Sequence, residues 1–105
     1  PMTTPSFVQI AAAANAEAMR YENPETALAQ VRKIEQVCSF DGYRWFVVSG
    51  TVFRKVSSFN SYFVARTAPD GTIMVGSEYT FASAEQSAFA DADRVRAKFD
   101  EREAV

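Results

Sequence analysis

The sequence predicts one α+β domain over residues 1–105, with two N-terminal helices, an antiparallel meander of three or four strands, and a C-terminal helix packed on the sheet. Three observations predict this fold. β-branched and aromatic residues concentrate between residues 43 and 80, turn signals divide that stretch, and apolar residues recur at helical spacing on both sides of it. A chain of 105 residues with 48% apolar content can bury one core without a disulfide or a metal.

Two helices are predicted before the strands. Thr4 and Pro5 signal the start of the first, because threonine can cap a helix and proline suits its first position. Its inner face is mostly alanine, which predicts close or weak packing. Asn23-Pro24 repeats the start signal for a second helix, whose buried face we assign to Ala27, Leu28, Val31 and Ile34.

Strands are expected at about 43–56, 60–68 and 72–80, with a further strand at 37–40 as the alternative to the end of the second helix. Asp41-Gly42 favours that strand, since a two-residue Asp-Gly loop between apolar runs is a strong hairpin signal. Successive turns predict an antiparallel meander. Ser49-Gly50 is expected to form a bulge or a tight connection, and Pro69-Asp70-Gly71 is expected to form a turn.

The last helix is predicted to start at Ser83, because Ser83-Ala84-Glu85-Gln86 matches the capping box. Apolar residues follow at helical spacing, whereas Asp91 and Asp93 are interpreted as solvated surface. Acidic residues at the C-terminal end oppose the helix dipole, so residues 101–105 are expected to fray. Pro1, at the other end, is interpreted as a cleavage scar from recombinant expression.

The chain lacks most of the chemistry that enzymes use. It has no histidine, which removes the commonest general base and most zinc sites. Cys38 is interpreted as a buried structural cysteine, and the four dispersed glycines form no phosphate-binding loop. We therefore predict that the protein is not an enzyme and has no catalytic residue, cofactor or metal.

A single cysteine fits a reducing compartment, and no apolar run is long enough to span a bilayer. These features predict a cytoplasmic protein without a membrane partner. The formal net charge of −2 is too small to imply non-specific binding to nucleic acid.

Positive charge gathers in the middle of the chain. Residues 43–80 carry four bases against two acids, a balance of +2, and each flank carries −2. The charges either block aggregation at sheet edges or attract an anionic partner. The four basic residues are Arg44, Arg54, Lys55 and Arg66.

The expected order of helix, three strands and helix over about residues 24–100 resembles that of double-stranded RNA-binding domains. Such domains hold phosphates with basic residues that open the last helix. Here the sequence at that position is Ser83-Ala84-Glu85-Gln86, and Asp91 and Asp93 follow. Because acidic residues repel phosphate, nucleic acid is a less favoured partner than protein.

The predicted function is non-catalytic protein interaction, in which the domain occupies a partner's surface as an adaptor or a stoichiometric inhibitor would. Three arginines share even parity and are expected on one strand face if no bulge intervenes. Aromatic residues of that parity would make the face apolar as well, which is typical of a protein-binding surface. The predicted partner-binding residues are Arg44, Phe46, Arg54, Lys55, Tyr62 and Arg66.

Three alternatives stay open at this point. Helices can cover both faces of the sheet, which would remove the exposed surface. The basic residues can instead bind nucleic acid or another anionic ligand. The sheet or its edge strand can pair with a second copy, which would make the protein a homodimer.

Overall fold

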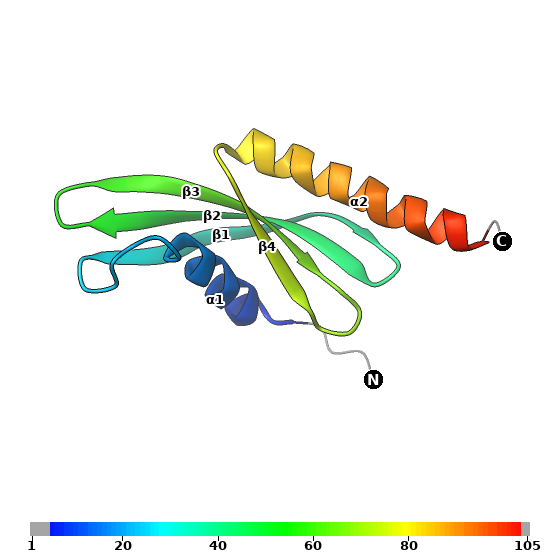
Figure 1. The fold of residues 1–105 in the computed structure, drawn as a ribbon, viewed down its shortest axis with the longest axis horizontal. Coiled ribbons are helices and arrows are strands. Elements are labelled where there is room, and N and C mark those ends of the chain that lie inside the picture. The colour runs from blue at the N-terminus through cyan, green and yellow to red at the C-terminus, as the bar shows by residue number, and fades with distance from the viewer. Residues whose placement is uncertain (1–4, 104–105) are drawn as a thin grey trace.

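The computed structural model describes residues 5–103 and shows an α+β domain with a four-stranded antiparallel sheet (Figure 1). The strands lie in the sheet in sequence order, so the predicted meander and the C-terminal helix are confirmed. Pro1, Thr4 and residues 104–105 lie outside the described range. The elements are α1 (Phe7–Ala18), β1 (Ala27–Phe40), β2 (Tyr43–Arg54), β3 (Ser58–Thr67), β4 (Ile73–Glu78) and α2 (Phe81–Glu103).

The second N-terminal helix is a wrong prediction, because residues 27–40 form strand β1. Asn23 and Pro24 begin a turn only, in which the Asn23 carbonyl accepts hydrogen bonds from the backbone of Thr26 and Ala27. Without that helix, the element order that resembled double-stranded RNA-binding domains is absent from the described chain.

Two bulges in β1 explain why its sequence imitates a helix. The register with β2 shifts once between Val31 and Lys33 and again between Gln36 and Cys38. Each extra residue moves the following side chains to the other face, so the alternation expected of a strand slips twice. Spacings of three then replace spacings of two, as at Val31 and Ile34, which both pack toward α1.

Both helix caps differ from the predicted ones. Ser6 caps α1, since its hydroxyl accepts a hydrogen bond from the backbone of Gln9, whose side chain accepts one from the backbone of Ser6. At α2, the Thr80 hydroxyl accepts the backbone N–H of Ser83 at 3.0 Å. Thr80 therefore does the capping, and Ser83 lies inside the helix. Residues 101–103, expected to fray, lie within α2.

The predicted turns at Asp41-Gly42 and Pro69-Asp70-Gly71 are confirmed, whereas the bulge or connection predicted at Ser49-Gly50 is wrong, because both residues pair within β2. Asp41 and Gly42 both have positive φ, at 49° and 86°, and join β1 to β2 as a two-residue hairpin loop. Gly71 has φ 91°, and its N–H donates to the carbonyl of Ala68 at 3.0 Å. Gly50 lies within β2, opposite the first bulge, where an added Cβ would approach the Gln30 carbonyl oxygen to 3.0 Å.

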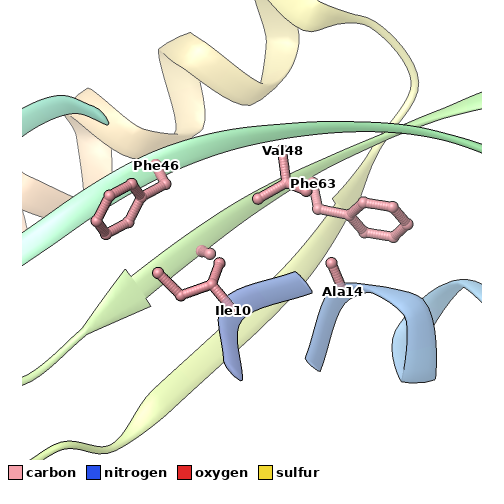
Figure 2. Close-up of a cluster of buried hydrophobic side chains, with 6 residues drawn as sticks. Ile10, Ala14, Phe46, Val48 and Phe63 are labelled. Atoms are coloured by element: carbon pink, nitrogen blue, oxygen red, sulfur yellow. The ribbon is translucent and has the colours of Figure 1, made fainter. Parts of the chain in front are cut away.

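The helices cover opposite faces of the sheet. Ile10 and Ala14 of α1 pack on three residues of the sheet, Phe46, Val48 and Phe63 (Figure 2). On the other face, Trp45 is fully buried against alanines of α2. The expectation of a bare sheet face in the monomer is therefore wrong, and the alternative with helices on both faces is the one observed.

The close contact between Pro69 and the hairpin loop that joins β1 to β2 can be tested by substitution of Gly42. Alanine at Gly42 would combine positive φ with a Cβ only 2.8 Å from Pro69 Cγ. We expect Gly42→Ala to lower the free energy of unfolding by about 1–2 kcal/mol, measured by urea denaturation. Gly76→Ala is the control, since its nearest contact would be an ordinary 3.6 Å, and it should change stability by less than about 0.5 kcal/mol. Equal losses in the two variants would contradict this account.

Candidate functional site

The six residues predicted to bind a partner do not share a face. The register pairs Trp45 with Arg66 and Arg44 with Thr67, so Arg66 lies on the side of α2 while Arg44 lies on the side of α1. Equal parity keeps two residues on one face only within a single regular strand. Phe46 is 3% exposed beneath α1, which removes it from any surface of the folded monomer.

The remaining predicted residues lie at separate places. Arg54 contacts Glu22 at 2.6 Å, Lys55 is exposed in the turn after β2, and Tyr62 is half-buried on the α2 side of β3. The structure thus contradicts a common face for this set. Their part in partner binding stays a prediction.

Asp91 of α2 accepts three hydrogen bonds at the boundary between the helix and the sheet. The donors are the Trp45 indole at 2.9 Å, Arg66 at 2.9 Å and Arg94 at 3.2 Å. Burial alone would raise the pKa of the Asp91 carboxyl, but these hydrogen bonds and the charge of Arg66 outweigh it and lower the pKa.

The sequence analysis missed the role of Asp91 in joining α2 to the sheet. The available signal was the position of Asp91 beside Ala88 and Ala92 at the edge of the buried stripe.

A cleft of about 300 Å³ lies beside this network, between α2 and strands β3 and β4. Its charged lining residues already have partners, because Asp91 joins Arg66 and Arg94 while Glu78 accepts a hydrogen bond from Ser87. The cleft therefore joins α2 to the sheet, and of its charged residues Asp91, Arg66 and Arg94 neutralise one another.

Strand β3 has a free edge near its beginning. β4 pairs only with residues Tyr62–Thr67, so residues 58–61 have β2 on one side and no strand on the other among the described residues. The Arg54 N–H donates to the Ser57 carbonyl at 2.7 Å, and this hydrogen bond fixes which residues of β3 have their main-chain groups directed at β2. Because antiparallel pairs alternate, the N–H and C=O groups of Ser58 and Asn60 point away from β2.

A groove of about 390 Å³ follows this free edge, and we call it the edge groove. Tyr21 and Tyr79 stand at its sides with 87% and 96% of their surfaces exposed. No lysine or arginine lines it. Its aromatic and acidic lining residues include Glu17, Tyr21, Glu22, Phe59, Glu78 and Tyr79.

The structure shows how a cation contacts this groove. The Arg54 guanidinium donates two hydrogen bonds to Glu22, and it lies 4.7 Å from the centroid of the Phe59 ring. The hydrogen bond from Arg54 lowers the pKa of Glu22. A carboxylate and an aromatic face therefore already hold one guanidinium at the rim of the edge groove.

No family model, curated protein or solved structure matches this chain. Within residues 5–103, no group of three or more acidic or cysteine side chains is arranged to hold a metal ion. In the same range, neither helix is long and apolar enough to cross a membrane.

The Asp91 network predicts a pH-dependent contribution to stability. Because the folded-state pKa of Asp91 is depressed, its ionised form stabilises the fold above the ordinary pKa, and this is lost as the pH falls through the folded-state pKa. We expect Asp91→Asn to cost about 1–3 kcal/mol at pH 7, since Arg66 loses its carboxylate. The difference from the parent should shrink below about pH 4.

Urea unfolding at pH 7 and at lower pH measures this effect. Asp93→Asn is the matched control, because Asp93 is exposed on the same helix. It should change stability by less than about 0.5 kcal/mol at either pH. A loss in Asp91→Asn that is independent of pH would contradict the role assigned to the ionised carboxylate.

Proposed function

We propose that this protein is a non-catalytic protein-interaction module that binds an extended, basic segment of a partner protein along the free edge of β3. The observation that supports this proposal is the unpaired stretch of β3 at residues 58–61, which forms one side of an aromatic and acidic groove. Either an adaptor or a stoichiometric inhibitor would act in this way, because each works by occupying part of its partner.

The free edge favours a polypeptide as the ligand. An extended segment can add to an exposed sheet edge through main-chain hydrogen bonds, while pockets for its alternate side chains give specificity. Ser58 and Asn60 offer two N–H and two C=O groups in the positions that a neighbouring strand uses. The bound segment would extend the line of β4 past Glu78, where β4 ends.

The groove's charge favours a basic segment. Glu17, Glu22 and Glu78 line it. Glu22 already pairs with Arg54, and Glu17 lies 3.8 Å from Arg20. Among residues 5–103, Glu78 accepts a hydrogen bond only from the uncharged Ser87 hydroxyl, so a partner's lysine or arginine would pair with Glu78. Tyr79 adds an exposed aromatic face that attracts cations, as the Tyr21 ring does for the Arg20 guanidinium, which lies 5.5 Å from its centroid. Phosphate would be repelled by the same carboxylates, which disfavours nucleic acid in this groove.

The anionic-ligand alternative of the sequence analysis has less support from the geometry. Arg54 and Arg66 are each paired with a carboxylate, and Arg44 lies at the opposite end of β2 from Arg54 and Lys55. Arg44 and Lys55, the two that lack a carboxylate partner among residues 5–103, therefore lie at opposite ends of β2.

The test uses a seven-residue peptide of alternating lysine and valine, with a peptide of alternating glutamate and valine as its charge-reversed counterpart. The native mass of the protein is first measured at the working concentration. Each peptide is then titrated into the isotopically labelled protein, and the amide NMR shifts of the protein are recorded. We expect the lysine peptide to bind at least about tenfold more tightly and to shift the amides of residues 58–61 and Tyr79. Equal binding of the two peptides, or shifts elsewhere, would contradict the proposal.

Proline at position 60 separates strand addition from simple charge attraction. Asn60→Pro removes an N–H that points away from β2, so the internal ladder is kept while the added strand loses a donor. We expect affinity for the lysine peptide to fall at least about tenfold, whereas Asn60→Thr, which keeps the N–H, should bind as the parent does. Thermal unfolding checks that both variants fold. Unchanged binding by a folded Asn60→Pro would exclude strand addition at this edge.

A further inference from the structure

Helix α2 covers only part of its sheet face. The strands β1, β2 and β3 extend beyond the first residue of α2 (Figure 1). Ser49 and Phe53 share the Trp45 face of β2 in this region, and Thr51 between them is buried without α2, beneath the Arg32 guanidinium. A hollow of about 520 Å³ lies there, and we call it the basic hollow. Its lining residues include Arg32, Lys33, Ser49, Asn60, Tyr62 and Phe81.

The charge of the basic hollow is opposite to that of the edge groove. No carboxylate lines it, and Arg32 has no ion-pair partner among residues 5–103. The Arg32 guanidinium is instead held over the sheet by one hydrogen bond to the Thr51 hydroxyl at 3.2 Å. Lys33 makes only a long, exposed contact of 3.7 Å with Glu35, which is too weak to neutralise it.

We propose that the basic hollow binds a small phosphorylated molecule. Arg32 and Lys33 supply two positive charges side by side, and Ser49, Asn60 and Tyr62 supply uncharged N–H and O–H donors around them. A carboxylate carries one negative charge, whereas a phosphate monoester carries about −1.5 to −2 over three terminal oxygens and so matches the two positive charges of Arg32 and Lys33 more closely. The donor set therefore fits phosphate better than carboxylate.

The volume and the aromatic residues fit a ligand larger than an inorganic ion. About 520 Å³ falls within the range of small-molecule sites. Tyr62 and Phe81 border the hollow, so a ring attached to the phosphate would have apolar surface to contact. The two charged residues of this site are separate from the proposed strand addition, because Arg32 and Lys33 do not line the edge groove, whereas Asn60 and Tyr62 line both hollows.

Phenyl phosphate and benzoate are the probes, since they share a ring and differ in the anion. Amide NMR titration at pH 7.5 should show phenyl phosphate binding at least about fivefold more tightly than benzoate, with shifts at residues 32, 33, 49 and 62. The affinity should fall below about pH 6, where the phosphate gains a proton. Benzoate binding as tightly as phenyl phosphate would overturn the assignment to phosphate, and shifts confined to other residues would overturn the site.

Charge-matched variants distinguish a built site from general attraction. Arg32→Gln and Lys33→Gln should each weaken phenyl phosphate binding by about tenfold. Lys98→Gln removes the same charge from an exposed position on α2 and should leave binding unchanged. Equal losses in all three variants would overturn the proposal. The lysine-valine peptide should still bind Arg32→Gln, so the two proposals can fail separately.

Discussion

The fold depends on the burial of both faces of strand β2. Four consecutive residues, Trp45 to Val48, are buried, and consecutive residues of a strand point to opposite faces. One helix on one face would leave half of these side chains in water. Each fully buried valine gains about 1.5–3 kcal/mol relative to exposure, so the sequence needs a covering element on each side. Helices α1 and α2 meet this need by presenting alanine, which lets them lie close to the large residues of β2.

This arrangement leaves a defined part of the sheet uncovered. β4 is six residues long and its partner β3 is ten, so the pairing stops at Tyr62 and the start of β3 keeps a free edge. The chain then turns directly into α2, which runs over the Trp45 half of its sheet face. Both proposed sites follow from this geometry, since the edge groove and the basic hollow share Asn60 and Tyr62 and lie at one end of the sheet.

The parts predicted correctly from the sequence are those that local rules determine. Asp41-Gly42 forms a hairpin because positive φ at two adjacent positions suits few residue pairs, and this rule does not depend on the rest of the fold. The end of β1 was predicted as the strand at 37–40, but residues 27–36 were missed because bulges at Arg32 and Val37 arise from pairing with β2, which is a long-range feature. The prediction that the three arginines share one face of the sheet was wrong for a related reason. Cross-strand register, which pairs Trp45 with Arg66, cannot be derived from parity along the chain.

The candidate sites were still harder to predict than the fold. The edge groove combines Tyr21 and Glu22, which follow α1, with Tyr79, which follows β4, so its lining is assembled only when the chain folds. The net charge of the chain also gives no indication of either hollow. A balance of −2 suggests a nearly neutral surface, yet Glu17, Glu22 and Glu78 gather on one hollow and Arg32 and Lys33 on the next.

The two proposed sites have opposite charge and share two lining residues, which has a consequence for binding. A cation in the edge groove and an anion in the basic hollow would lie on either side of Asn60 and Tyr62. Opposite charges attract, and partly buried pairs are screened less than exposed ones. Occupation of one hollow would therefore favour occupation of the other, and by linkage the effect would be reciprocal. Both proposed sites therefore depend on the same uncovered end of a small sheet, because β4 and α2 both stop short of the same residues of β3.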